Sequence, residues 1–146
     1  PFPKVPNTLS EPIIIHLLKN KKLIPELANY EFHKGSIRGN KADISAVYKS
    51  SIKTIQAKST GEADFITFGA KDMGADYFIW LRFRNAFVQN NFSELSMVII
   101  KKPKEHPKLF KWTEGGTKNK LNFNELKTKN LAKMITKKIN LYSALK

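Results

Sequence analysis

The segment "DYFIWLRF" at residues 76–83 limits the possible folds more than any other part of the chain. Six of its eight residues are apolar, and they fall on both faces that an extended chain presents. A short run of this kind, rich in aromatic residues, is typical of a strand that is covered on both sides. Such a strand needs packed layers above and below its sheet. We therefore expect an α/β protein with a mixed central β-sheet flanked by helices.

The rest of the chain supplies elements for that sheet, and its 146 residues suit a single domain over residues 1–146. Pro25 interrupts the segment after the first helix, and Gly35 and Gly39 mark a loop. In chain order we expect a helix with Ser10 as its N-cap, a helical turn and a strand near 30–33, a hairpin at 42–48 and 52–58, a helix over 65–73, the buried strand, a strand at "LSMVII", and a final amphipathic helix with Leu126, Leu131, Met134, Ile135 and Leu145 on its apolar side.

The net charge of the chain indicates a polyanionic partner. Lysine and arginine number 26 against 12 acidic residues, which gives +14. Residues 101–146, a lysine-rich C-terminal part, hold 13 lysines and 3 glutamates and so carry +10 of that charge. A strongly positive surface on a small protein attracts nucleic acid. A solvated lysine-rich surface, an acidic membrane surface and an acidic protein partner remain as alternatives.

The composition also excludes several kinds of site. The chain has no cysteine, so disulfides, thiolate catalysis and cysteine-based zinc sites are ruled out. His16, His33 and His106 are scattered without the spacing of a zinc site. The chain has no apolar run near the ~18 residues of a membrane span and no secretory signal at its start. We expect a cytoplasmic, intracellular protein without a membrane partner or a small-molecule cofactor.

Three polar residues of the predicted hairpin could form a hydrolytic site. Alternation along a strand places Gln56 and Lys58 on one face, and pairing of the two arms brings Asp43 beside them. Phosphodiester hydrolysis needs a hard cation on the phosphate, an activated water and positive charge near phosphorus. Mg²⁺ binds carboxylate and carbonyl oxygens and keeps several waters, so one or two acids can hold it. The other interpretation is an ordinary solvated sheet face.

The spacing of these residues resembles a known family. Asp43, twelve intervening residues, an amide, any residue and then Lys58 is similar to the motif of the PD-(D/E)XK nucleases. The glycine–serine loop in "KGSIRGNKADISA" and the buried strand in "MGADYFIWLRF" look most like the archaeal-type Holliday junction resolvases of that superfamily. The resemblance covers about residues 10–100. It implies a restriction-endonuclease-like fold and a Mg²⁺-dependent nuclease in which Mn²⁺ can substitute.

The resemblance also assigns roles to individual residues. It implies that Asp43 and Gln56 bind the metal and, with the catalytic Lys58, make up the catalytic set. The family often adds a glutamate from its first helix. Glu11 matches it best, and Glu26 and Glu31 are rivals. The expected DNA-binding residues come from the loop before Asp43 and from the end of the buried strand: Lys34, Ser36, Arg38, Lys41, Arg82 and Arg84.

The function that follows is a DNA endonuclease that hydrolyses phosphodiester bonds with a metal-activated water. We expect it to act as a homodimer on branched, Holliday-junction-like DNA, because a two-fold dimer suits a symmetric substrate. One alternative is a small type II restriction endonuclease that cuts duplex DNA at a specific sequence. Another is an inactive DNA-binding protein on the nuclease scaffold, because Gln56 stands where an acid is usual in the family.

Overall fold

The computed structural model describes residues 7–20, 23–37, 39, 41–61, 63–83, 94–113, 119–129 and 133–138. The helical elements among them are α1 (Asn7–Leu18), η1 (Pro25–Leu27), α2 (Ala70–Met73), η2 (Pro103–Glu105) and α4 (Phe123–Lys129). The strands are β1 (Glu31–Lys34), β2 (Ile44–Tyr48), β3 (Ser51–Thr60), β4 (Phe65–Thr67), β5 (Tyr77–Arg82), β6 (Glu94–Lys101), β7 (Lys120–Asn122) and β8 (Lys133–Lys138). None of the described helices is long and apolar enough to cross a membrane.

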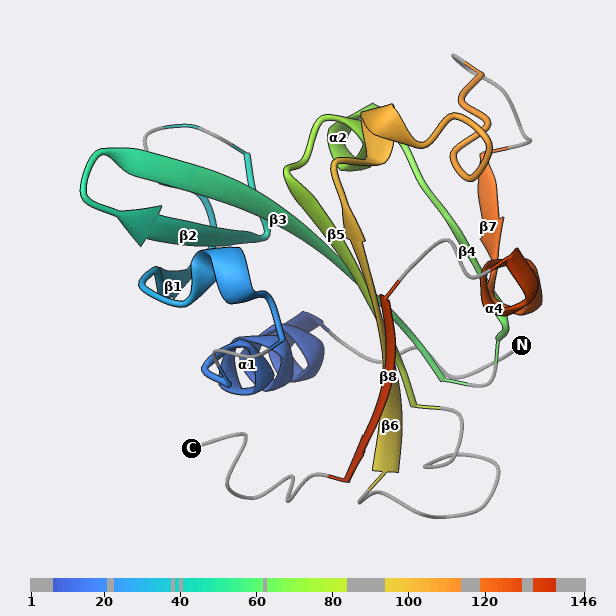
Figure 1. The fold of residues 1–146 in the computed structure, drawn as a ribbon, viewed down its shortest axis with the longest axis horizontal. Helices are drawn as coiled ribbons and strands as arrows, with labels where there is room; N and C mark the ends of the chain where they lie inside the picture. The colour runs from blue at the N-terminus through green and yellow to red at the C-terminus, as the bar shows by residue number, and fades with distance from the viewer. Residues whose placement is uncertain are drawn as a thin grey trace.

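Six of these strands form one mixed sheet in the order β1-β2-β3-β5-β6-β8 (Figure 1). Strands β1, β2 and β3 follow one another as an antiparallel meander, and β5 then pairs in parallel with β3. Strands β6 and β8 continue the sheet with antiparallel pairs. Strands β4 and β7 form a separate two-stranded sheet. The predicted mixed central sheet of an α/β protein is thus confirmed.

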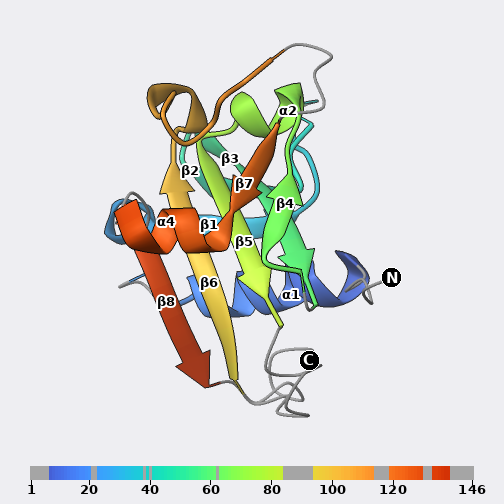
Figure 2. The same ribbon diagram turned by 90° about the vertical axis from the view of Figure 1, so that its right-hand side faces the viewer.

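The central sheet is covered on both faces, as the "DYFIWLRF" segment predicts. Every residue of β5 is buried. Ile79 and Leu81 belong to the core that includes α1, whereas Phe78 and Trp80 belong to a second core on the other side. Figure 2 shows that β4, β7 and α4 cover this second side, with α1 behind the sheet. The second layer is therefore mostly a small sheet, where we expected helices.

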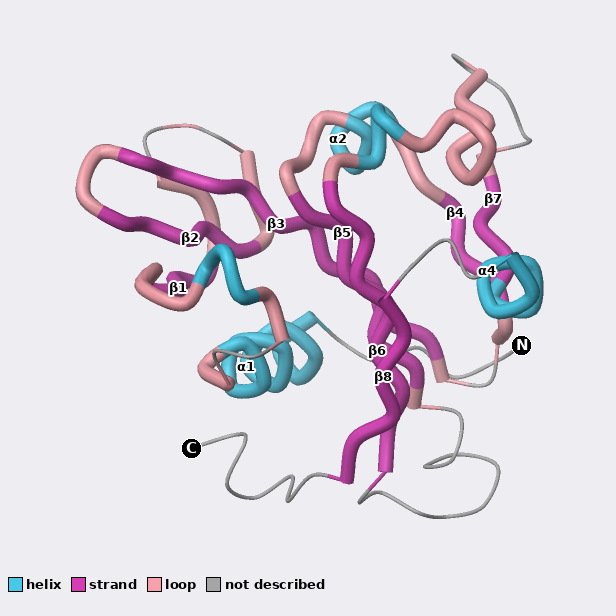
Figure 3. The backbone as a smooth tube through the Cα atoms, viewed as in Figure 1, coloured by secondary structure: helices cyan, strands magenta, loops and turns pink. Residues whose placement is uncertain are grey.

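Strand β3 changes its neighbours along its length, and this change creates the place for the site. Its first half pairs with β2 up to Ile55, which lies opposite Ile44. From Ile55 to Thr60 it pairs instead with β5. The β2–β3 hairpin extends away from β5 and β6 (Figure 3), with β1 paired along β2. Residues after Ile55 therefore lie beyond the register of β2, next to the residues that precede β2.

Two predictions on the first two thirds of the chain need correction. Helix α1 begins at Asn7, so Ser10 lies inside the helix, where it is buried, and is not its N-cap. The helix expected over 65–73 is wrong for its first part, because Phe65–Thr67 is β4 and the helix covers Ala70–Met73 alone. Pairing of β4 with β7 supplies backbone hydrogen bonds that a local apolar pattern does not reveal.

The expected C-terminal amphipathic helix is also wrong over Lys133–Lys138, whereas its predicted residues Leu131 and Leu145 lie outside the described residues. Helix α4 ends at Lys129, and Lys133–Lys138 forms β8 against β6. The edge of β6 offers unpaired backbone groups, and the β-branched Ile135 and Thr136 suit a strand. The lysine-rich C-terminal part thus adds strands to both sheets. Residues 139–146 lie outside the described residues.

Candidate active site

Asp43 stands directly before β2, and the loop that leads to it is fastened to that strand. The amide of Gly35 donates to the Asp43 carbonyl at 2.7 Å, and Ser45 Oγ donates to the Gly35 carbonyl at 2.8 Å. Gly35 has a φ of 85°, which a side chain would disfavour. The Asp43 carboxylate accepts the Ala57 amide at 3.0 Å through Oδ2. It thereby satisfies an amide of β3 just before β2 begins.

Gln56 and Lys58 lie on the face of the sheet opposite α1. Ile55 and Ala57 belong to the core that includes α1, so the residues that alternate with them point the other way. Gln56 is 3% exposed, which excludes a solvated face at this position. Its Nε2 donates to the Lys41 carbonyl at 3.1 Å. This bond orients the amide and leaves Oε1 buried, with no hydrogen-bond donor among the described residues.

Glu11 brings a second carboxylate to Asp43 from α1. Glu11 is 8% exposed, and its Oε2 is buried without a donor among the described residues. Burial raises the pKa of Glu11 above its ordinary 4.5, and the nearby charge of Asp43 raises this pKa further. Lys34 and Lys71 act in the opposite direction on the same pKa. The charge of Asp43 therefore acts on the ionisation of Glu11.

The rival glutamates lie elsewhere. The Glu26 carboxylate forms an ion pair with Lys101 Nζ at 2.8 Å. The Glu31 side chain is 83% exposed and lies 3.7 Å from the His33 ring nitrogen. Glu31 also pairs across the strands with Val47, which lies four residues beyond Asp43. Of the three candidates, Glu11 is the one whose pKa the charge of Asp43 is shown to raise.

Helix α2 contributes two charged residues that the sequence does not single out. Lys71 Nζ lies 3.3 Å from Asp43 Oδ1, and Lys58 Nζ lies 3.7 Å from Asp72 Oδ2. Asp72 is buried, and its Oδ2 also accepts the Gly69 amide at 2.9 Å. Two lysine–carboxylate pairs therefore join α2 to the hairpin. No local spacing indicates them, because the contacts depend on how the chain between β3 and β5 folds back.

Glu11, Asp43 and Gln56 carry oxygens of the kind that a hard divalent cation binds. Mg²⁺ takes carboxylate and amide oxygens and completes its coordination with waters. Among the described residues, no three His, Cys, Asp or Glu side chains gather as a metal-binding group. Buried oxygens without donors are costly unless a partner neutralises them. A cation bound at either buried oxygen would supply such a partner.

The residues predicted to bind DNA fall into three groups. Lys34, Ser36 and Lys41 are exposed and lie at the end of β1 or in the loop before Asp43, beside the site. Arg38 and Arg84 lie outside the described residues. The prediction that Arg82 binds DNA needs a correction, because its side chain is buried.

The Arg82 side chain is 8% exposed and is held inside the protein. Its guanidinium forms an ion pair with Asp64 and lies 3.4 Å from the centre of the Phe123 ring. A guanidinium stacked on an aromatic ring and paired with a carboxylate is a packing contact between the two sheets. Arg82 therefore does not present its charge to DNA.

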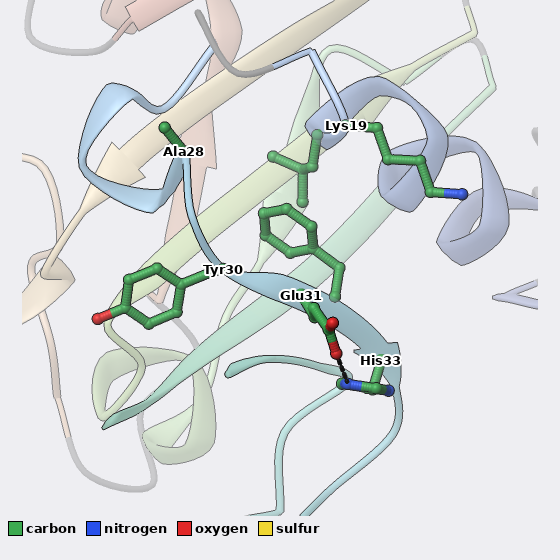
Figure 4. Close-up of a pocket in the computed structure, with 7 residues that line it drawn as sticks. Lys19, Ala28, Tyr30, Glu31 and His33 are labelled. Atoms are coloured by element: carbon green, nitrogen blue, oxygen red, sulfur yellow. Dashed lines mark ion pairs between the residues drawn. The ribbon is translucent and has the colours of Figure 1, made fainter. Parts of the chain in front are cut away.

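A separate pocket of about 390 Å³ lies between the end of α1 and β1 (Figure 4). Its lining residues are Leu18, Lys19, Ala28, Tyr30, Glu31, Phe32 and His33. Figure 4 shows the ion pair of Glu31 with His33 at its rim. The lining includes none of the residues around Asp43, so this pocket is distinct from the candidate active site.

A scan against protein-family models finds no match for this chain, and a search of curated proteins finds no similar sequence. The likeness to the PD-(D/E)XK nucleases therefore stays a prediction from a short motif. The chemistry of the candidate site has to be argued from its own residues.

Proposed function

We propose that this protein is a Mg²⁺-dependent DNA endonuclease that acts on branched DNA as a homodimer. The observation that carries the proposal is the pair of buried oxygens without donors among the described residues, Glu11 Oε2 and Gln56 Oε1, on residues that the sequence motif groups with Asp43 and Lys58. Buried polar groups are usually hydrogen-bonded, so a buried oxygen without a donor needs an explanation such as a bound ion, a water or a catalytic role. Mn²⁺ should substitute for Mg²⁺, because both accept oxygen ligands.

Each residue has a role in this proposal. Glu11, Asp43 and Gln56 would hold the cation. When bound, Mg²⁺ would polarise the scissile phosphate and favour the ionised form of a coordinated water. Lys58 would place its ammonium beside the phosphate, where it offsets the charge that grows as the water oxygen bonds to phosphorus and the bond to the leaving oxygen breaks. Asp72 holds the Lys58 ammonium in place from α2.

The order of the elements supports the finer assignment to a restriction-endonuclease-like fold. A helix with a glutamate, a hairpin with the Asp and Gln-x-Lys residues, a helix and then a buried strand is the arrangement that the resemblance implies. Here α1, the β2–β3 hairpin, α2 and β5 follow in that order, and β5 pairs in parallel with β3. The net charge of +14, with Lys34 and Lys41 exposed beside the site, supports DNA as the substrate.

Cleavage assays test the proposal directly. The wild-type protein is incubated with supercoiled plasmid, linear duplex and a synthetic four-way junction, with Mg²⁺, Mn²⁺ or EDTA. We expect cation-dependent cleavage of the junction, and its loss in Asp43→Asn and Lys58→Ala. Lys111→Ala, which removes an exposed lysine from the region after η2, serves as a control that should keep activity. Cleavage that survives both site substitutions would reject the assignment.

A second candidate is a DNA-binding protein that keeps the scaffold without cleaving. Gln56 favours it, because an amide lacks the negative charge of the usual acid and so binds Mg²⁺ more weakly. Tight junction binding in a gel-shift assay, with no cleavage in either metal, would favour this function. Discrete fragments from linear duplex would instead favour a restriction endonuclease.

A further inference from the structure

The ion pair between Lys71 and Asp43 occupies one oxygen of the central carboxylate of the site. Lys71 Nζ is 3.3 Å from Asp43 Oδ1, and Asp43 Oδ2 is engaged by the Ala57 amide. Described protein groups thus contact both oxygens of Asp43. The Lys71 side chain is 53% exposed and the Asp43 side chain is 25% exposed. The ammonium therefore reaches the carboxylate from the solvent side of α2.

Two features allow the Lys71 ammonium to move away from Asp43 when a cation binds there. Its stem is flexible and half exposed, so an alternative position in water is available at low cost. Asp43, in contrast, is held by the backbone of β3. A divalent cation on Asp43 repels an ammonium at the same oxygen, so the two cannot both occupy it favourably.

The pair also has a reason to exist before a cation arrives. The charge of Asp43 raises the pKa of Glu11, so it disfavours the ionised form of that carboxyl. Lys71 and Lys34 are the lysines whose positive charge counteracts this repulsion at Glu11. Lys71 makes the direct contact with Asp43. It can therefore neutralise the acidic pair while the cation is absent.

We propose that Lys71 is a tethered counter-ion that occupies Asp43 until a divalent cation displaces it, so that Lys71 weakens the affinity of the site for that cation. This inference rests on the proposed function, because it assumes that Asp43 binds a metal. It adds a residue from α2 that sets how much Mg²⁺ or Mn²⁺ the site requires.

Isothermal titration of Mn²⁺ into the DNA-free protein tests the proposal without any cleavage. Lys71→Gln should bind Mn²⁺ about two- to fivefold more tightly than the wild type, the range that a partly exposed ion pair allows. Lys71→Arg keeps the charge and should stay close to the wild-type affinity. Lys19→Gln is the matched control for charge, because Lys19 is exposed and lies about 12 Å further along the α1 axis than Glu11.

Unchanged or weaker Mn²⁺ binding by Lys71→Gln, with a circular dichroism spectrum like that of the wild type, would overturn the role of Lys71 alone. Equal tightening in Lys19→Gln would also overturn it, because general charge would then explain the effect. Absence of Mn²⁺ binding in the wild type would reject the metal site itself, and with it the proposed function. Thermal melting gives a second measure, since Lys71→Gln should lower the cation-free melting temperature and gain more from added Mn²⁺.

Discussion

Replacing Glu11 with glutamine should make the cation-free protein more stable while it removes the metal response. Glu11 is 8% exposed, and its buried Oε2 has no donor among the described residues. Leaving a buried polar group unsatisfied costs about 1–3 kcal/mol. Glutamine keeps the size of the side chain and removes its charge. We therefore expect the free energy of unfolding to rise by about 1 kcal/mol, near the lower end of that range. For a chain of this size that corresponds to a melting temperature about 4 °C higher.

The gain should depend on pH in a defined direction. Burial and Asp43 raise the pKa of Glu11 in the folded protein above the 4.5 of the unfolded chain. Below pH 4.5 the carboxyl is protonated in both states and does not distinguish them. As the pH rises from 4.5 to the higher folded pKa, the unfolded chain releases this proton first, so the wild type loses stability relative to Glu11→Gln. Above that window the difference stays constant.

Urea unfolding of both proteins between pH 4 and 8, in EDTA and in Mg²⁺, measures these effects. Glu31→Gln is the matched control, because that carboxylate is 83% exposed and its removal should change stability by less than about 0.5 kcal/mol. Mg²⁺ should stabilise the wild type and the control but not Glu11→Gln. A loss of stability in Glu11→Gln at pH 7, or a difference that does not vary with pH, would refute the reasoning.

Three further substitutions test separate parts of the structure. Gln56→Glu should bind Mg²⁺ more tightly by calorimetry, yet lose about 1–3 kcal/mol in urea unfolding because a carboxylate cannot donate to the Lys41 carbonyl; weaker Mg²⁺ binding would contradict this. Asp72→Asn should keep its acceptor for the Gly69 amide and lower kcat for cleavage more than it changes KM, whereas an unchanged kcat would separate Asp72 from the site. Arg82→Ala should destabilise the fold by about 3 kcal/mol in urea and leave the salt dependence of DNA binding unchanged, since the buried guanidinium serves packing.

The sequence alone predicts the elements whose pattern is strong and local. The apolar run at 76–83 identifies the central strand, because a strand buried on both faces can hardly have another composition. The hairpin predicted at 42–48 and 52–58 is confirmed by the pairing of β2 with β3. The loop marked by Gly35 and Gly39 is confirmed as well, since both glycines have a positive φ. Side-chain alternation then places Gln56 and Lys58 on one face without knowledge of the rest of the fold.

The elements that the sequence misassigned depend on distant partners. Residues 65–67 and 133–138 have apolar residues at spacings that also suit a helix. They become strands because β7 and the edge of β6 offer them backbone hydrogen bonds. Those partners lie far away in the chain, so no local window contains the information. In such segments, pairing with a neighbouring strand outweighs the local preference for a helix.

The residues of the candidate site likewise fall into those that the sequence predicts and those that only the tertiary structure reveals. The sequence by itself determined the side chains of the hairpin, Asp43, Gln56 and Lys58, because strand geometry fixes their spacing. Tertiary structure decided which glutamate the charge of Asp43 acts on, since α1 with Glu11 packs against the sheet. It also decided that Lys71 and Asp72 complete the arrangement of charges. The physical reason is that covalent spacing sets distances within one element, whereas the burial of apolar surface sets distances between elements.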